Sequence, residues 1–418
     1  MNRTQTALKI REQFEEFMGI VSPHFSKPLC KFLNQMVFGL QSSKDIKLSN
    51  VSRALDEPIA LKKTEERLSR NLKTAGMDDK LNHIIANKGA SRIGRDTLII
   101  VDPTDIRKEY AQKMPHLATI RDGSSGKLAT GYSGCIALAC EPRSRKMTPL
   151  HLRLWSSEAT DFVSENDQVL TVMRTINQAA QGRGIFVYDR GGDRKTIMYN
   201  LLDRECRMVI RQVGNRHVIF NGKAQEELKV AEGCAMKYAE TIVKETRRGG
   251  EKTYHLEFGV RKVKLLDRDD QMTLVVVRGF GQKPLMLLTN VVVKNSRKSV
   301  WRIVEAYLSR WLVEEAIRFM KQSYNLEDIR LLDWQRLKNM MGILLLTLYF
   351  LSVHLGEGIR LQILAGHIIT ASKRFYGVTE FCYYALADGV GALLSRISPK
   401  KCKTAPREDP QGWLPGFA

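Results

Sequence analysis

Two short apolar runs that each end on an aspartate, TLIIVD at residues 97–102 and GIFVYD at residues 184–189, decide the fold of this chain. Runs of this length that carry isoleucine and valine are typical of strands buried on both faces of a sheet. Between them, SGCIALAC (133–140) and PLHLRLW (149–155) predict two more strands, and the spacing of apolar residues in 165–184 predicts an amphipathic helix.

The residues that follow the second run continue this pattern. GDRKTIMYNLLDRE (192–205) fits a helix and RMVIRQV (207–213) fits a fifth strand, which gives the order β-β-β-α-β-α-β. Strands followed by alternating helices and strands favour an α/β fold, in which helices pack on a mixed sheet. The rhythm then breaks, because TYHLEFGVRKVKLL (253–266), MTLVVVRGF (272–280) and PLMLLTNVVV (284–293) predict three strands in succession.

The charge of the chain points to its partner. Its 418 residues include 66 Lys+Arg against 45 Asp+Glu, a net charge of +21. Such a surplus is costly unless it meets a polyanion, so we expect nucleic acid first and an anionic membrane surface second. The apolar stretch 340–356 falls short of the roughly 20 residues that a membrane span needs, so we expect a helix buried in protein and no membrane partner.

Cysteine usage and the N-terminus predict the compartment. The seven cysteines are scattered and include no C-x-x-C pair, which argues against both a disulfide framework and a zinc site. The first residues, MNRTQTALKIREQFEEF, carry charges where a signal peptide needs an apolar core. We therefore expect a cytoplasmic protein with reduced thiols.

The pattern divides the chain into five segments. Residues 1–95 read as helical and carry 17 basic and 10 acidic residues, and residues 214–298 carry the same numbers, so each segment contributes +7. We predict a helical N-terminal DNA-binding region at 1–95, the first part of the α/β core at 96–213, a β-rich insertion at 214–298, one long helix that completes the core at 299–330, and a helical C-terminal region with a basic tail at 331–418.

The N-terminal region contains a candidate DNA-binding element. Leu48, Val51 and Leu55 have helical spacing, the DEP at 56–58 interrupts it, and a second amphipathic helix follows. This arrangement suits a helix-turn-helix whose second helix enters a major groove, but it equally suits an ordinary helical pair with a solvated basic face. The basic residues on the outer positions of the second helix, the candidate DNA contacts, include Lys62, Lys63, Arg67 and Arg70.

The two aspartates that end the apolar runs, Asp102 and Asp189, are the first candidate catalytic residues. Taken singly, each could be a helix cap or a turn residue. Together they are acids at apolar strand ends inside a strongly basic chain. A basic surface attracts a polyanion and an acid cluster within it can hold divalent metal, which is the logic of two-metal phosphoryl transfer.

A third acid comes from the long helix SVWRIVEAYLSRWLVEEAIRFMKQSY at 299–324. At about 100° per residue, Tyr307, Arg310, Glu314 and Lys321 fall within an arc of about 60°. One stripe thus carries a carboxylate, two cations and a phenol. The alternative is a solvated helix face on which Arg310 and Glu314 form an ordinary i,i+4 ion pair.

This spacing, Tyr307-x2-Arg310-x3-Glu314-x6-Lys321, resembles the Y-x2-R-x3-E-x6-K signature of bacterial DDE transposases of the insertion-sequence-4 family. The DPTD at 102–105 resembles the family's first-aspartate motif and the YDRGGDR at 188–194 its second. The order of the motifs and the β-rich insertion between the second and third acids also agree. The resemblance covers about residues 95–325.

The resemblance implies a ribonuclease H-like catalytic core. In it, Asp102, Asp189 and Glu314 would be the catalytic acids and would hold two Mg²⁺ ions, for which Mn²⁺ should substitute. Tyr307, Arg310 and Lys321 would contact the transposon-end DNA near the scissile phosphate. Some relatives stack a flipped base on a tryptophan of the insertion, but Trp301 lies 13 residues before Glu314, inside the predicted helix, so we expect core packing for it instead.

The function that the resemblance implies is DNA transposition of the cut-and-paste type. The enzyme would bind the terminal inverted repeats of its own mobile element, cleave there in a metal-dependent reaction, and join the ends to target DNA. It would act as a homodimer on double-stranded DNA in the bacterial cytoplasm, at the nucleoid when bound. The alternatives are a ribonuclease H-fold DNA nuclease, a domesticated DNA-binding protein that no longer integrates, and a regulator with an inactive core.

Overall fold

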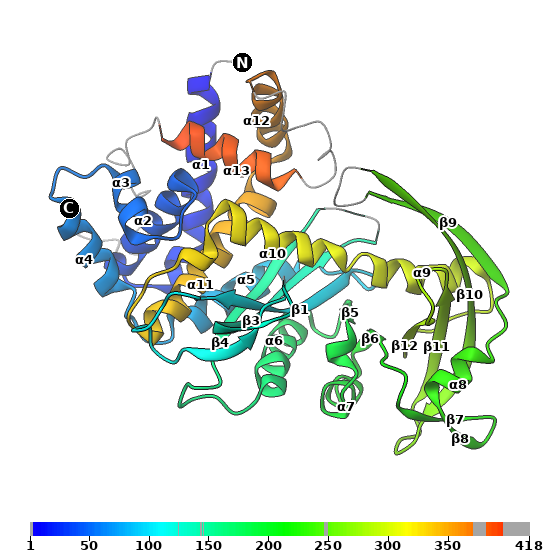
Figure 1. Ribbon diagram of the computed structural model, residues 1–418. Coiled ribbons are helices and arrows are strands. Elements are labelled where there is room, and N and C mark those ends of the chain that lie inside the picture. The colour runs from blue at the N-terminus through cyan, green and yellow to red at the C-terminus, as the bar shows by residue number, and fades with distance from the viewer. Residues whose placement is uncertain are drawn as a thin grey trace, which may run out of the picture.

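The computed structural model describes residues 3–123, 125–142, 144, 146–245, 250–370 and 382–395. Its centre is one mixed sheet of 12 strands with helices packed on it (Figure 1). The strands follow the order β2-β3-β1-β5-β6-β12-β11-β10-β7-β8, with β4 beside β3 and β9 beside β10. The predicted α/β class with a mixed sheet is therefore confirmed.

The core strands follow the predicted order, with one short strand added. β3 runs antiparallel to β1, β2 and β4, whereas β5 runs parallel to β1 and β6 parallel to β5. The additional strand, β2, has only four residues and was too short to recognise in the sequence. The elements are β1 (Leu98–Arg107), β2 (Ala118–Arg121), β3 (Leu128–Cys140), β4 (Thr148–Trp155), α6 (Glu165–Ala180), β5 (Ile185–Tyr188), α7 (Lys195–Asp203) and β6 (Arg207–Arg211).

The alternation of side chains along the strands decides which way the two aspartates point. Leu98 and Ile100 belong to the core on the face of the sheet that carries α9 and α10. The residues that alternate with them, Ile99 and Val101, belong to the core on the other face, with α6 and α7. Successive strand residues point to opposite faces. Asp102 therefore continues the row of Leu98 and Ile100, and Asp189 continues the row of Ile185 and Val187.

We predicted that the first strand ends at Asp102, but β1 continues for five more residues to Arg107. Its pairing with β5 stops at Ile100 opposite Val187, whereas its pairing with β3 continues to Arg107 opposite Gly131. The apolar run thus marks the end of burial on both sides and not the end of the strand. Asp102 lies just beyond the point where β1 and β5 part.

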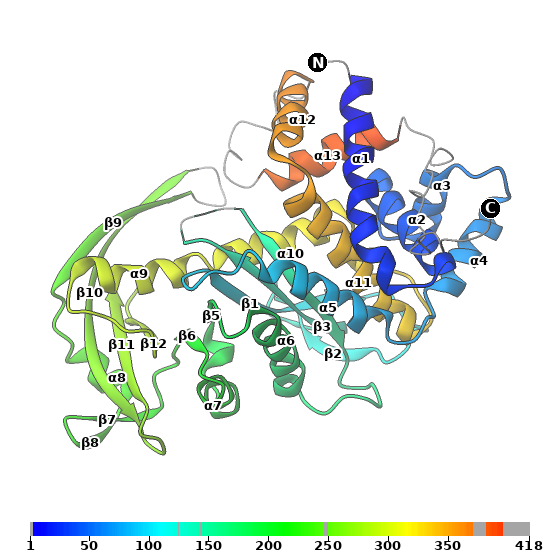
Figure 2. The same ribbon diagram turned by 180° about the vertical axis from the view of Figure 1, so that it is seen from behind.

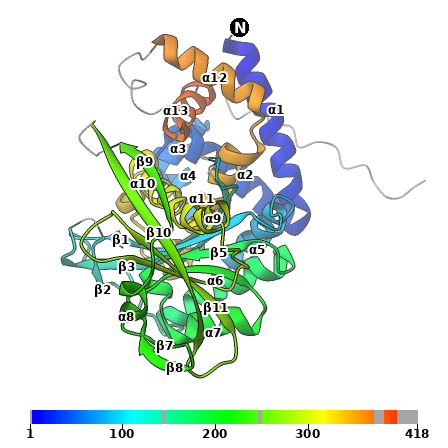
Figure 3. The same cartoon turned by 90° about the vertical axis from the view of Figure 1, so that its right-hand side faces the viewer.

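The strands of residues 214–298, the segment that we predicted as an insertion, belong to the same sheet as the core strands. β12 pairs antiparallel with β6, and β11 and β10 follow in order. In Figures 1 and 3 the pair β9–β10 curves away beyond the rest of the sheet. The elements of the insertion are β7 (His217–Phe220), β8 (Lys223–Glu226), α8 (Glu227–Glu232), β9 (Tyr238–Glu245), β10 (Glu251–Leu265), β11 (Gln271–Arg278) and β12 (Leu285–Thr289).

The N-terminal and C-terminal helices pack together at one end of the sheet (Figure 2). Gly342 of α11 lies so close to α5 that a Cβ would come within 3.1 Å of the Asp78 Cα. The N-terminal elements are α1 (Arg3–Val21), η1 (Ser22–His24), α2 (Lys27–Ser43), α3 (Leu48–Leu55), α4 (Leu61–Asn71) and α5 (Met77–Ala90). The C-terminal ones are η3 (Leu326–Asp328), α11 (Trp334–Tyr349), η4 (Phe350–His354), α12 (Glu357–Thr370) and α13 (Tyr383–Leu394).

The apolar C-terminal stretch is inside the protein. Among the described residues, one helical segment, Trp334–His354, is long and apolar enough to cross a membrane, and 83% of its most apolar window is buried. Its side chains pack with Phe14 and Phe17 of α1. This is the buried helix that we expected. The predicted basic tail at 398–418 lies outside the described residues.

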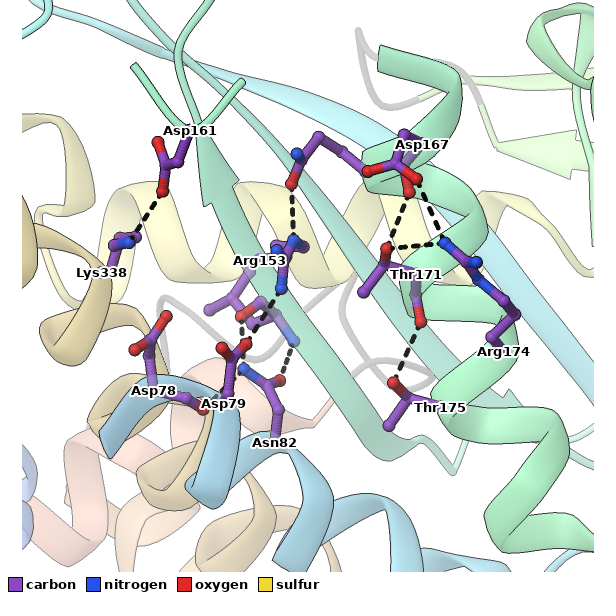
Figure 4. Close-up of polar contacts among 12 residues, drawn as sticks. Asp78, Asp79, Asn82, Arg153, Asp161, Asp167, Thr171, Arg174, Thr175 and Lys338 are labelled. Carbon is purple, nitrogen blue, oxygen red and sulfur yellow. Dashed lines mark hydrogen bonds and ion pairs between the residues drawn. The ribbon is translucent and has the colours of Figure 1, made fainter. Parts of the chain in front are cut away.

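A polar network joins the N-terminal helices to the free edge of β4 (Figure 4). The Asn82 side chain of α5 accepts a hydrogen bond from the Leu152 N–H at 2.8 Å and donates one to the Leu152 carbonyl at 3.1 Å. It thereby pairs with the edge strand as a neighbouring peptide would. Arg153 of β4 contacts Asp79 at 3.0 Å, and Lys338 contacts Asp161 at 3.2 Å. Helix α5 is thus anchored to the core.

The predicted single helix at 299–330 is in fact two helices, α9 (Arg297–Leu308) and α10 (Trp311–Ser323). Between them the backbone tightens, since the N–H groups of Arg310 and Leu312 bond to carbonyls only three residues earlier. The Ser309 hydroxyl also donates to the Glu305 carbonyl at 2.8 Å, and such local bonds bend helices. The apolar periodicity runs through this turn, so the sequence pattern did not reveal it.

Candidate active site

Arg310 brings the three predicted acids together. Its Nη1 lies 3.3 Å from Asp102 Oδ2, its Nη2 lies 4.0 Å from Asp189 Oδ2, and Nη2 also pairs with Glu314. The acids come from β1, from the residue after β5 and from the first turn of α10. One guanidinium is therefore in contact with carboxylates from three separate elements.

The turn between α9 and α10 puts Arg310 in this position. Arg310 is the residue before α10 and keeps right-handed helical dihedrals, so its side chain leaves the helix start toward the sheet. Val313, Ala316 and Met320 are buried and dock α10 on the core. Because the docking face is fixed, the neighbouring stripe of α10 must lie over the strand ends.

Asp189 has a second set of partners on the other side. The Tyr307 hydroxyl donates to Asp189 Oδ1 at 2.9 Å, and Arg211 Nη1 lies 3.4 Å from the same oxygen. Arg211 Nη1 also donates to the Tyr307 hydroxyl at 3.1 Å. Arg211 is the last residue of β6, the parallel neighbour of β5. We did not single it out from the sequence, although it lies at the end of β6 just as Asp189 lies at the end of β5.

The environment gives the two aspartates opposite pKa shifts. Burial raises the pKa of Asp102 to about 7, with Arg310 opposing the shift and the other two acids adding to it. Burial also acts to raise the pKa of Asp189, but Arg310 and the hydrogen bonds to its carboxylate hold it below the ordinary value. The side chain of Asp102 is 16% exposed and that of Asp189 31%. Asp102 is thus the acid whose negative charge is least compensated.

The fourth residue of the stripe, Lys321, contacts a different pair of acids. Its Nζ lies 3.0 Å from Asp105 Oδ2 and 3.0 Å from Glu327 Oε1. The carboxylates hold the pKa of Lys321 above its ordinary value although burial acts to lower it. The sequence had placed Asp105 in the first-aspartate motif without giving it a role.

The donor chemistry of the three acids fits a hard divalent cation, because Mg²⁺ prefers carboxylate oxygens. The raised pKa of Asp102 supports the fit, because it shows that the carboxylate lacks enough positive charge nearby. As the side chains stand, no group of three His, Cys, Asp or Glu residues among those described could hold a metal. Arg310 takes up the carboxylates in this conformation.

The candidate DNA contacts of α4 lie apart from the acids, at the helical end of the molecule (Figures 1 and 2). Lys62, Lys63 and Arg70 are exposed. Arg67 is only partly exposed, because its Nη2 pairs with Glu57 Oε2 at 2.6 Å. Helices α3 and α4 form on either side of the predicted turn. Their arrangement fits both a DNA-binding pair of helices and an ordinary helical pair, so the DNA contacts stay a prediction.

Two further sequence expectations concern residues near the site. Trp301 packs in the core, 5.3 Å from the Phe258 ring between centroids, as we expected. Asp193, which fell inside the helix that we predicted at 192–205, lies before α7, forms an ion pair with Arg216 at 2.6 Å and accepts the Val213 N–H at 2.8 Å. The residue that precedes α7 is Arg194.

Comparison with known proteins identifies a family for this chain. Residues 93–351, more than half of the chain, match the family model described as Transposase DDE domain. A search of curated proteins found no match. Among solved structures, the chain is similar to a piggyBac transposase in a synaptic complex with hairpin DNA, with a TM-score of 0.39 and 10% identity. The alignment covers 82% of this chain and 58% of that one. By the family match, the chain belongs to the Transposase DDE domain family.

Proposed function

We propose that this protein is a cut-and-paste transposase that binds the terminal inverted repeats of its own element, cleaves there, and joins the ends to target DNA. The observation that carries the proposal is the convergence of Asp102, Asp189 and Glu314 on one guanidinium. These acids lie inside a chain of net charge +21, which draws in a polyanion.

We further propose a ribonuclease H-like core. The strand order β4-β3-β1-β5-β6, with three antiparallel strands followed by two parallel ones, supports this assignment. The motif spacing and order support membership of the insertion-sequence-4 group. In this reading the strands of residues 214–298 are an insertion that has joined the edge of the core sheet.

The three acids would hold two Mg²⁺ ions, or Mn²⁺ in their place. When bound, such a pair supplies a nucleophilic oxygen and stabilises the leaving oxygen of an in-line displacement at phosphorus. Arg310, Tyr307 and Lys321 would bind phosphates of the DNA end by charge-assisted hydrogen bonds. Because Arg310 contacts all three acids in this conformation, we expect a DNA phosphate to draw its guanidinium away from them.

The remaining parts of the proposal concern partners and place. The helical region 1–95 would recognise the terminal repeat through Lys62, Lys63, Arg67 and Arg70. A homodimer would hold two DNA ends together, since both must be cut and joined. We expect the protein in the cytoplasm, at the nucleoid when it is bound to DNA.

The experiment uses the DNA that flanks the reading frame. A labelled duplex with the inverted repeat nearest the frame is incubated with the purified protein and either Mg²⁺ or EDTA, together with a target plasmid. We expect cleavage at the repeat only with Mg²⁺, followed by a product in which the label is joined to the plasmid. Cleavage without joining would instead favour a nuclease or a domesticated relative. Intact DNA in both reactions would contradict the proposal.

A further inference from the structure

Lys321 is held in a clamp of two carboxylates that are not among the three acids of the proposed site. Its Nζ lies 3.0 Å from Asp105 Oδ2 and 3.0 Å from Glu327 Oε1. The Lys321 side chain is 21% exposed and that of Asp105 only 14%. The ammonium therefore has a fixed place at the edge of solvent.

Both carboxylates of the clamp are themselves anchored. Asp105 belongs to β1, and its Oδ1 accepts the Gly123 N–H at 3.1 Å. Glu327 belongs to the short helix η3, which Lys108 ties down by donating to the carbonyls of Glu327 and Ile329, each at 2.6 Å. Lys108 is 8% exposed, so this anchor is part of the folded core. The clamp is therefore built by three elements, β1, α10 and η3.

The clamp lies at a similar distance from the three acids along both the helix and the strand. Lys321 lies seven residues beyond Glu314 on α10, about 10 Å at 1.5 Å per residue. Asp105 lies three residues beyond Asp102 on β1, about 10 Å at 3.3 Å per residue. The helix and the strand thus carry the lysine and its partner the same distance from the three acids.

Simple electrostatics does not explain these two acids. A surface that only attracts DNA gains nothing from carboxylates beside its phosphate contact, since like charges repel. A lysine has three N–H donors, and two carboxylates occupy two of them. Among the described residues no acceptor takes the third, and its direction is set because the other two are fixed.

We propose that Asp105 and Glu327 are positioning residues that hold the Lys321 ammonium with one N–H free for a DNA phosphate neighbouring the one at the three acids. This inference rests on the proposed function, because it needs Lys321 to contact DNA. It gives a role to the second aspartate of the DPTD motif. Neither residue touches the reacting atoms, and both act through Lys321.

The test is a double-mutant cycle on cleavage of the terminal duplex under single-turnover conditions. Asp105→Asn should slow cleavage by about 10- to 100-fold, since small misplacements cost this much. It should nevertheless bind the duplex at least as tightly as the wild type, because it loses a negative charge. In the Lys321→Ala background, Asp105→Asn should have no further effect. Glu327→Gln should behave in the same way and serves as a second variant if Asp105→Asn melts early.

The matched control is Glu109→Gln, which removes the same charge four residues further along the chain. Glu109 pairs with Arg107 and does not contact Lys321. It should cleave at the wild-type rate or faster. The inference is overturned if the effects of Asp105→Asn and Lys321→Ala multiply, or if Asp105→Asn accelerates cleavage. If Lys321→Ala itself cleaves at the full rate, the proposed role of Lys321 fails instead. If the wild type does not cleave, the proposed function fails.

Discussion

Two networks of acids and bases, one between α5 and the edge of β4 and one under α10, are built differently. At the joint with α5, Arg153 is held by Asp79 at 3.0 Å and by Gln168 at 2.6 Å, and Asn82 pairs fully with the backbone of Leu152 (Figure 4). Under α10, by contrast, one guanidinium serves three carboxylates, and its Nε has no partner among the described residues.

The difference illustrates two roles that charged and polar side chains can have, one in stability and one in binding. The joint satisfies its polar groups within the chain, so it contributes to stability and has nothing left for a ligand. The acid cluster leaves Asp102 with a pKa raised to about 7, which is a cost to the fold. We read that cost as the sign of a site that is completed by a cation and a phosphate.

The largest effect that we expect on stability comes from Arg310→Ala. Removal of Arg310 leaves Asp102 and Glu314 without a cation among the described residues, because Arg211 contacts Asp189 alone of the three acids. Breaking a buried ion pair costs about 3–5 kcal/mol. Denaturant unfolding in EDTA should show a loss of this size. Mn²⁺ should restore more stability to this variant than to the wild type, because a cation can replace the guanidinium. A variant as stable as the wild type in EDTA would contradict the contrast between the two networks.

Asn82→Ala should cause the next largest loss of stability. It leaves the N–H and carbonyl of Leu152 unpaired at a buried strand edge, which we expect to cost about 2–4 kcal/mol in the free energy of unfolding. Mn²⁺ should not restore this loss. Asn200→Ala is the control, because among the described residues the Asn200 side chain has one hydrogen bond, accepted at the surface from Arg204 at 3.1 Å. An Asn82 variant that unfolds like the control would show that the joint does not anchor α5.

A buried acid far from both networks sharpens the comparison. Glu227 is 0% exposed, and neither carboxylate oxygen has a hydrogen-bond partner in the described structure. Burial raises its pKa to about 8, from an ordinary 4.5. The folded state therefore binds a proton that the unfolded state has lost between these values, so stability should fall as pH rises, by about 1.4 kcal/mol per unit.

Unfolding curves at pH 5, 6, 7 and 8 test this expectation. Glu227→Gln keeps the shape of the protonated side chain and should remove the fall in stability that Glu227 causes across this range. Its advantage over the wild type should therefore be largest at pH 8. Equal slopes for the two proteins would mean that Glu227 is ionised in the folded protein.

The smallest effects should come from α4, where some basic residues are engaged and others are free. Arg70 is exposed, and if α4 contacts phosphates, Arg70→Ala should reduce the slope of log K against log salt by about 1. Arg67 already pairs with Glu57, so Arg67→Ala should change the slope less. Binding to the terminal duplex at several salt concentrations measures both. Unchanged slopes for Arg70→Ala, Lys62→Ala and Lys63→Ala would favour an ordinary helical pair.

Much of the core could be predicted because local patterns determine it. Apolar runs predicted β1 and β5, and the alternation along them turns Asp102 and Asp189 to the same face. The length of β1 could not be predicted, because residues 103–107 owe their strand conformation to pairing with β3, which is remote in sequence. The turn at Ser309 could not be predicted either, because a tightened turn leaves the spacing of the apolar residues intact.

The site was predictable in its members but not in all its contacts. The spacing of Tyr307, Arg310, Glu314 and Lys321 placed them on one stripe. In the structure Tyr307, Arg310 and Lys321 each contact an acid, and Glu314 pairs with Arg310. Arg211 and Glu327 could not be found in this way. Their roles depend on which strand lies beside β5 and where the chain returns after α10.

The most direct test of the central claim is the rate at which the terminal duplex is cleaved in Mg²⁺ by the wild type and by Asp102→Asn, Asp189→Asn, Glu314→Gln and Asp79→Asn. We predict a loss of about 10³-fold or more for each of the first three, because metal ions supply several kcal/mol to the transition state. Asp79→Asn, in the joint, should cleave at nearly the wild-type rate. Full activity in any of the first three, with Asp79→Asn equally active, would contradict the account.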